Sequence, residues 1–225
     1  MNLRDHPQAP VMFETREPSK QKLEAHGIQV LLRYTATGSD KRNDMLIHPF
    51  AHGQKSLYYA ESAPEPFGYG MVACLYLAEG AGEMGLLDSD PRVQPYLDYN
   101  YLVTDWDRAR MRESVRICID ISEQAGMADI IKGPMDPNQT DLESDDALDA
   151  WLLRNVRTSH HISGTCKMGP DSDDMAVVDQ FGKVRGVEGL RVADASIMPD
   201  CIRANTNVTA MVIGERIADF IKNGK

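Results

Sequence analysis

Short apolar runs alternate with turn residues through the first half of the chain. The runs lie at residues 27–34, 44–50, 71–78 and 95–103, and segments rich in glycine, proline or polar residues separate them. Runs of this length bounded by turn residues predict strands. Because they follow one another through turns rather than through helices, the pattern favours an antiparallel sheet. The segment at residues 2–10 is polar and bounded by proline.

From residue 106 the apolar positions recur at intervals of three and four, which predicts an amphipathic helix over residues 106–126. Its C-terminus is expected at Gly126, because helices often end on a glycine. Shorter helices are expected over residues 21–26 and 145–156, and an acidic loop with two prolines over residues 133–146.

The last third of the chain is punctuated by glycines before a final helix. Two short β-prone runs at residues 176–179 and 190–193 are separated by glycine turns. A helix is then expected to begin near Asn205, with Val208 and Met211 at helical spacing. Asn and Thr at its start can cap the free N–H groups of the first turn. The positive end of the helix dipole there favours an anionic neighbour.

Composition excludes several classes of protein. The chain has 225 residues, of which 42% are hydrophobic and 26% charged, as in an ordinary globular protein with one sizeable core or two small ones. A formal net charge of −10 argues against a nucleic-acid partner and against an anionic membrane, because both recruit basic surface. No apolar run approaches the length of about 18 residues that spans a bilayer.

Cysteine usage and the start of the chain favour a cytoplasmic location. The four cysteines, Cys74, Cys118, Cys166 and Cys201, form no C-x-x-C pair, which favours buried free thiols over disulfides. Residues 1–10 contain no apolar segment of the kind found in secretory signals.

Three sequence blocks near the C-terminus stand in order: HHISGTCKMG at residues 160–169, VEGLRVADASIMPD at residues 187–200 and NTNVTAMVIGERIADFI at residues 205–221. Together they resemble the C-terminal signature of the glucose–methanol–choline (GMC) family of flavin oxidoreductases. NLRDHP, at residues 2–7, resembles a segment from the middle of full-length members, and this resemblance implies that residues 2–10 are the end of a loop. No G-x-G-x-x-G follows a predicted strand near the N-terminus, and the three glycines within residues 79–85 are interpreted as a turn.

The resemblance implies an α+β fold, in which an antiparallel sheet backed by helices forms the substrate domain. A C-terminal segment would complete a flavin-binding domain whose N-terminal Rossmann unit is missing. On this basis residues 1–26 are a connecting segment, residues 27–156 the substrate-binding domain and residues 157–225 the catalytic, flavin-contacting segment. The substrate pocket would lie somewhere within residues 31–101.

His161 is the candidate catalytic base. Alcohol oxidation by a flavin needs a group that takes the hydroxyl proton, and an imidazole has a pKa near neutrality. His161 matches the family's H-x-x-G-T pattern, whereas His160 is expected either to support His161 without touching the substrate or to have a packing role. Asn205 matches the second catalytic position, where an amide can hold the substrate oxygen against the imidazole. From the residues alone, a His-His pair in a loop is more often structural, and Asn205 can simply cap its helix.

Two segments are candidates for contact with FAD. The resemblance places the backbone of Asp194 and Ala195 near the ribityl–pyrophosphate part of the cofactor. It directs the first turn of the final helix at the flavin pyrimidine ring, through Asn205, Thr206, Asn207 and Val208. Asp194 can equally be a turn-forming carboxylate.

Two functions remain open. The chain is either the catalytic half of an FAD-dependent oxidoreductase acting on a small-molecule alcohol, with a second chain that carries the Rossmann half, or a truncated gene product without catalysis. Lyase chemistry on a flavin is a less favoured third reading. A metal site at His48 and His52 is disfavoured by Pro49 between them, and a serine hydrolase by the lack of G-x-S-x-G.

Overall fold

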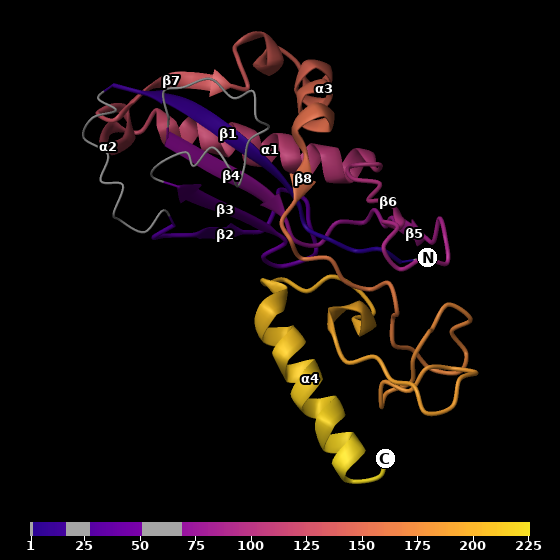
Figure 1. Ribbon diagram of the computed structural model, residues 1–225. Helices are drawn as coiled ribbons and strands as arrows, with labels where there is room; N and C mark the ends of the chain where they lie inside the picture. Colours follow the sequence, from indigo (N-terminus) through magenta and orange to yellow (C-terminus); the bar gives the residue numbers. More distant parts are fainter. Residues whose placement is uncertain (1, 17–27, 51–68) are drawn as a thin grey trace. The chain divides into compact units, whose positions relative to one another are not determined.

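The computed structural model describes residues 2–16, 28–50 and 69–225, which fall into two compact units (Figure 1). The unit that we call the sheet unit comprises residues 7–75 and 104–157. The other, which we call the histidine unit, comprises residues 1–6, 76–103 and 158–225. Each unit is therefore built from segments that lie far apart in the sequence. The division into segments at residues 26 and 156 stays a prediction.

An antiparallel sheet forms the centre of the sheet unit. Its strand order is β2-β3-β4-β1-β7, with β8 pairing to β1. The strands are β1 (Pro7–Thr15), β2 (Leu32–Tyr34), β3 (Met45–Phe50), β4 (Tyr69–Leu75), β7 (Ile131–Asp136) and β8 (Arg157–Thr158). The antiparallel sheet with helices confirms the predicted α+β class.

The expected loop at residues 2–10 is wrong from Pro7 onward, because β1 (Pro7–Thr15) is an inner strand of the sheet. Ala9, Val11 and Phe13 are fully buried, and nearly all its other residues are buried as well. A strand covered on both sides shows no alternation of polar and apolar residues. Its prolines precede Met12, where pairing with β7 begins, so they interrupt no bond of that ladder.

Three other local expectations are also wrong. The predicted loop at residues 133–146 contains β7 and the 3-10 turn Thr140–Leu142. The predicted strand at residues 95–103 shrinks to β6 (Tyr96–Asp98), and the runs at residues 176–179 and 190–193 form only isolated bridges. Each of these segments is short, so long-range pairing outweighs its local preference. The expected helix at residues 21–26 and His52 lie outside the described residues.

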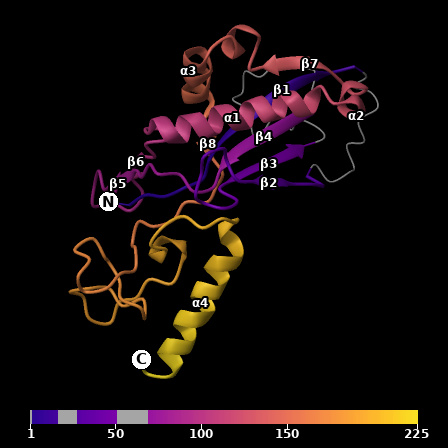
Figure 2. The same ribbon diagram turned by 180° about the vertical axis from the view of Figure 1, so that it is seen from behind.

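Helix α1 (Asp105–Ser122) lies along one face of the sheet, as the two opposite views in Figures 1 and 2 show. It buries Met111, Val115 and Cys118 completely. The Thr104 hydroxyl caps its first turn by accepting a hydrogen bond from the Asp107 N–H. The helix ends at Ser122, with Glu123 as its C-cap, rather than at Gly126, which belongs to the short helix α2 (Ala125–Ala128). Helix α3 (Asp145–Asn155) forms as predicted, with Ser144 as its cap.

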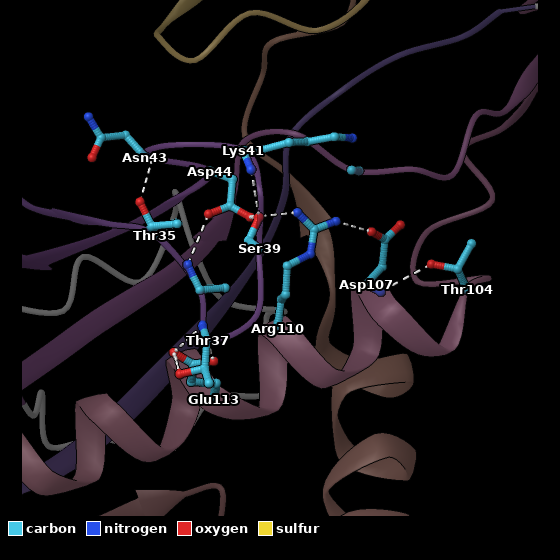
Figure 3. A network of polar contacts seen from close by, with 12 residues as sticks. Thr35, Thr37, Ser39, Lys41, Asn43, Asp44, Thr104, Asp107, Arg110 and Glu113 are labelled. Atoms are coloured by element: carbon cyan, nitrogen blue, oxygen red, sulfur yellow. Dashed lines mark hydrogen bonds and ion pairs between the residues drawn. The ribbon is translucent and has the colours of Figure 1, made fainter.

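A charged network joins α1 to the loop before β3 (Figure 3). The Arg110 guanidinium is fully buried and donates to Asp44 at 2.8 Å and to Asp107 at 2.5 Å. Asp44 also accepts hydrogen bonds from the Ala36 N–H and the Ser39 hydroxyl. Burial alone would raise the pKa of Asp44, but these three donors outweigh it and hold the pKa below its usual value.

The histidine unit contains little regular structure besides its helix. It holds the strand pair β5 (Glu83–Gly85) and β6, the 3-10 turn Ala195–Ile197, here called η3, and α4 (Thr206–Lys222). The glycines at residues 80, 82 and 85 have dinucleotide-motif spacing, but they lead into β5 and not into a helix. A Cβ at Gly82 would lie 2.0 Å from the Asp98 carbonyl oxygen, so this glycine serves a close approach of two backbones.

All four cysteines are free, with Cys74, Cys118 and Cys201 buried and Cys166 half-buried. In the part of the chain that the structure describes, no helix is long and apolar enough to cross a membrane.

Candidate active site

A backbone pairing brings two distant histidines together in the histidine unit. Arg4 and Ser163 exchange both of their backbone hydrogen bonds, at 2.9 and 2.8 Å, and the Ser159 N–H donates to the His6 carbonyl. Residues 2–6 and 159–164 therefore run antiparallel to each other. Gly164 follows with a φ of +80°, and a Cβ there would lie 2.7 Å from the Asn2 carbonyl oxygen. The glycine of the H-x-x-G-T pattern is thus required by this pairing.

His161 contacts the buried His6 through like ring nitrogens. The two Nδ1 atoms are 2.9 Å apart, which is a hydrogen-bond distance. The Nε2 atom of His6 lies 2.8 Å from the Ile202 carbonyl oxygen. His6 has no exposed surface, whereas His161 is half-buried. His160 does not pack as expected, because its side chain is exposed and its backbone has a φ of 62°.

Asp5 fixes the backbone around both rings. Its Oδ1 accepts hydrogen bonds from the N–H groups of His6, at 2.8 Å, and His161, at 3.0 Å. Its Oδ2 accepts a short hydrogen bond from the Tyr101 hydroxyl. Asp5 is almost fully buried, so its negative charge is close to the imidazoles in a weakly screened environment.

Tyr76 links the histidine pair to Asn205. Its ring stacks on His6, with centroids 4.3 Å apart and an interplanar angle of 13°. Its hydroxyl donates to the Asn205 Oδ1 atom at 3.2 Å. Asn205 stands at the N-cap position of α4, but its side chain makes no capping hydrogen bond. The purely structural reading of Asn205 as a helix cap is therefore not what the structure shows.

Burial keeps both imidazoles neutral near pH 7. Burial, and then the neighbouring His161, lower the pKa of His6 to about 4. Burial also lowers the pKa of His161, with a further lowering from His160, while the charge of Asp5 opposes it. A neutral, half-buried imidazole can accept a proton from a bound hydroxyl group.

The candidate flavin-contacting residues lie on two segments of the same unit. The Asp194 carboxylate accepts from the Ser196 N–H and caps η3, so its side chain is turn-forming. The Ala195 carbonyl accepts from the Gly164 N–H, which joins this segment to the one that carries His161. Thr206 is buried, whereas Asn207 and Val208 are exposed at the start of α4.

The first turn of α4 fits an electron-rich ring. It contains no acidic residue, and the N-cap side chain does not occupy its N–H groups. Such N–H groups stabilise negative charge that develops next to them. Among the described residues, no group of three or more His, Cys, Asp or Glu side chains is placed to hold a metal ion.

Sequence reasoning named His161 and Asn205 but gave no role to the residues that connect them. His6 and Asp5 belong to the quoted NLRDHP segment, so the resemblance was the signal that could have found them. Tyr76 and Tyr101 belong to no quoted block. The structure brings all of these side chains into one unit with His161 and Asn205.

Comparison with known proteins extends this description. The GMC oxidoreductase family matches residues 78–214. An oxygen-dependent choline dehydrogenase from Cronobacter sakazakii is 38% identical over 165 residues, 73% of this chain and 29% of that protein. The oxygen-dependent choline dehydrogenase 1 from Chromohalobacter salexigens is 31% identical over 242 residues, 98% of this chain and 43% of that protein.

Solved structures share the fold. Pyridoxine 4-oxidase from Mesorbium loti has a TM-score of 0.84 and 23% identity, covering 97% of this chain and 42% of its own. A formate oxidase from Aspergillus oryzae, studied for the modification of its FAD, has a TM-score of 0.86 and 21% identity, covering 100% and 47%.

The chain therefore belongs to the GMC oxidoreductase family, which confirms the predicted family. It spans less than half the length of each of these relatives.

Proposed function

We propose that the chain is the substrate-binding and catalytic half of an FAD-dependent oxidoreductase that acts on the CH–OH group of an alcohol. The observation that carries this proposal is the neutral His161 imidazole, held by His6 and Asp5 in the unit that also contains Asn205. The choline dehydrogenase relatives support a small alcohol as the substrate.

The chain's own residues handle the proton in this proposal. FAD, when bound, supplies the acceptor for the hydride that leaves the alcohol carbon. His161 takes the hydroxyl proton as the C–O bond becomes a carbonyl, so that proton and hydride leave the alcohol together. The Tyr76 hydroxyl occupies the Asn205 Oδ1 atom, which directs the amide so that its Nδ2 group is the donor for the substrate oxygen.

For the flavin itself, we assign the ribityl–pyrophosphate side to the backbone at Asp194 and Ala195. The pyrimidine side would contact Asn205, Thr206, Asn207 and Val208. This assignment is supported by the uncapped first turn of α4 and by the Gly164–Ala195 hydrogen bond. Among the described residues no strand–G-x-G-x-x-G–helix unit forms, and we therefore assign the adenine nucleotide to another binding element.

The exposed face of α4 supports a second chain as the source of that element. Val208, Met211 and Val212 are 64%, 56% and 60% exposed. Together with Glu215, Arg216 and Asp219 they line a surface groove of about 490 Å³. A contiguous exposed apolar stripe with a charged rim is typical of a surface that another protein segment covers.

The test is to look upstream for a reading frame that encodes a G-x-G-x-x-G-bearing half, to co-express the chain with such a half, and to record visible spectra and alcohol turnover. We expect a yellow complex whose flavin is bleached by a small alcohol. His161→Ala should lower turnover about 10²- to 10⁴-fold, the usual effect of a general base, with flavin still bound. His160→Ala, the exposed neighbour, is the matched control and should keep its rate.

Two outcomes would contradict the proposal. A yellow His161→Ala complex with unchanged turnover would remove His161 as the base. A chain that stays colourless with FAD and with every nucleotide-binding half would favour the alternative, a truncated gene product without catalysis. If the chain alone retains flavin through gel filtration, the need for a second chain is wrong while the catalytic assignment stands.

A further inference from the structure

We propose that His6 is a positioning residue that sets the tautomer of His161: it keeps the hydrogen on Nδ1 and leaves the lone pair on Nε2. We base this inference on the hydrogen-bond distances that link the Ile202 carbonyl, the His6 ring and the His161 ring. Its catalytic meaning rests on the proposed function, but the tautomer is a property of this chain without flavin.

The polarity of this series of hydrogen bonds is decided at the Ile202 carbonyl, the end away from His161. The Ile202 carbonyl oxygen, 2.8 Å from His6 Nε2, can only accept a hydrogen bond. Nε2 of His6 therefore carries a hydrogen. A neutral imidazole has one N–H and one lone pair, so the lone pair of His6 is on Nδ1. His6 stays neutral because it is fully buried, with a pKa lowered to about 4 by that burial and by His161.

The contact between the two rings then has one possible polarity. The Nδ1 atoms of His6 and His161 are 2.9 Å apart, and a hydrogen bond of this length needs one hydrogen between them. Because His6 Nδ1 holds a lone pair, the hydrogen comes from His161 Nδ1. In neutral His161 the lone pair is therefore on Nε2, the nitrogen that does not face His6.

His6 is held against a ring flip from both sides. A flip would exchange Nδ1 and Nε2 positions for carbon atoms and would break the contacts to Ile202 and His161 together. Stacking on Tyr76 at 4.3 Å covers one face of the ring, and Asp5 fixes the His6 backbone N–H. The ring is thus a fixed acceptor before any substrate arrives, as preorganisation requires.

The same contact supports the protonated state of His161. When His161 accepts a proton on Nε2, its Nδ1–H remains directed at the neutral His6 lone pair. A hydrogen bond from a charged donor is stronger than one from a neutral donor, so the imidazolium gains from a contact that already exists. Nearby Asp5, which accepts from the His161 backbone N–H, adds an attractive charge.

The direct test is long-range ¹H–¹⁵N correlation spectroscopy of the full chain with ¹⁵N-labelled histidine at pH 7.5. His161, assigned by loss of its signals in His161→Gln, should show a protonated Nδ1 and an unprotonated Nε2. His6 should show the reverse pattern. A His161 that carries its hydrogen on Nε2 in the unmodified chain overturns the proposal, and this readout needs neither a variant of His6 nor flavin.

Two variants of His6 sharpen the test. His6→Phe keeps an aromatic ring against Tyr76 but removes the acceptor, so His161 should lose its single tautomer and populate both. His6→Asn restores an acceptor oxygen near the position of Nδ1 and should return His161 to the Nδ1–H form. His160→Gln is the matched control and should leave the pattern unchanged. An unchanged His161 pattern in folded His6→Phe also overturns the proposal.

Turnover of the flavin-loaded complex separates this proposal from the proposed function. His6→Phe should lower turnover by at least about 10-fold, with partial rescue in His6→Asn and with flavin content unchanged. If the Nδ1–H tautomer is observed but no alcohol is oxidised, the proposed function fails and the tautomer assignment stands. If alcohol is oxidised while His161 carries its hydrogen on Nε2, the assignment to His6 fails alone.

Discussion

The sheet unit and the histidine unit each bury a polar network, and the two networks differ in charge. In the sheet unit, Arg110 and its partners Asp44 and Asp107 are charged and fully buried. In the histidine unit, His6 and His161 are neutral imidazoles joined through ring nitrogens. Both networks connect distant segments, 66 positions apart for Asp44 and Arg110 and 155 for the two histidines.

This difference in charge suggests that one network stabilises the fold and the other takes part in catalysis. A guanidinium does not titrate in proteins, and the pKa of its partner Asp44 is held below its usual value. An imidazole exchanges its proton near neutrality, and each ring in the histidine pair can donate through one nitrogen and accept through the other. We therefore expect the first network to govern stability and the second to govern proton transfer. Four sets of measurements test this expectation.

The largest expected effect is on the stability of the sheet unit. Arg110→Met leaves two buried carboxylates without their cation, and the loss of one partner of a buried pair costs about 3–5 kcal/mol. Urea unfolding of the two chains measures the difference. Arg116→Met on the same helix is the control, because Arg116 is 47% exposed in its ion pair with Asp145 and should cost less than about 1 kcal/mol. Equal losses would contradict the distinction.

The second effect is a pH dependence of stability. His6 has a pKa of about 4 in the folded chain and about 6.5 when unfolded, so the unfolded state binds more protons as the pH falls below 6.5. Stability is therefore lost as the pH falls from 6.5 toward 4, by about 2 kcal/mol at pH 5. The fall in urea midpoint between pH 7.5 and 5 should be smaller in His6→Phe than in the unmodified chain.

His48 provides the corresponding test in the sheet unit. Burial lowers its pKa to about 4 as well, so His48→Phe should also flatten the pH dependence. If neither substitution changes the slope, other groups govern the acid sensitivity and the stated pKa shifts are wrong.

The third effect concerns helix caps. Thr104→Ala removes the side chain that caps α1, which typically costs about 1 kcal/mol. Asn205→Ala at the N-cap of α4 removes no capping hydrogen bond and should cost less than about 0.5 kcal/mol. The same two variants should separate in the flavin-loaded complex, where only Asn205→Ala lowers alcohol turnover. A larger stability loss for Asn205→Ala would identify it as a structural cap.

The smallest expected effect on stability is that of Tyr76→Phe. The ring stack on His6 remains, and only the hydroxyl that donates to the exposed Asn205 is lost, so the cost should stay below about 0.5 kcal/mol, as for Asn205→Ala. In the flavin-loaded complex the freed Asn205 amide should raise KM or lower kcat for the alcohol. Steady-state kinetics together with thermal unfolding measure both. Unchanged kinetics would show that Tyr76 does not orient Asn205.

Long helices were predictable from this sequence because their signals are local. α1, α3 and α4 each carry helical apolar spacing, and α1 and α3 begin at a Thr or Ser that caps them. Strands β1 and β7 were missed, since each contains proline and their pairing is decided by partners elsewhere in the chain. Short strands depend on tertiary context more than helices do.

The candidate site likewise contains residues that the sequence identified and residues that only the structure identified. His161 and Asn205 lie in blocks that could be matched to a family, and their roles stay predictions. The roles of His6 and Tyr76 follow from contacts across 155 and 129 positions, which no local pattern contains. For Asp194 the sequence left two roles open. In the structure its carboxylate caps a turn, so the proposed cofactor contact is limited to its backbone.

The long separation between His6 and His161 also sets an order of events on the ribosome. At about 5–20 residues per second, His161 is synthesised about 8–30 s after His6. During that interval Asp5 and His6 are already made, while the segment that will pair with them does not yet exist. The sheet unit is complete once Arg157 is synthesised, just before residues 158–225. The segment that completes the pair of imidazoles is thus synthesised only after the whole sheet unit.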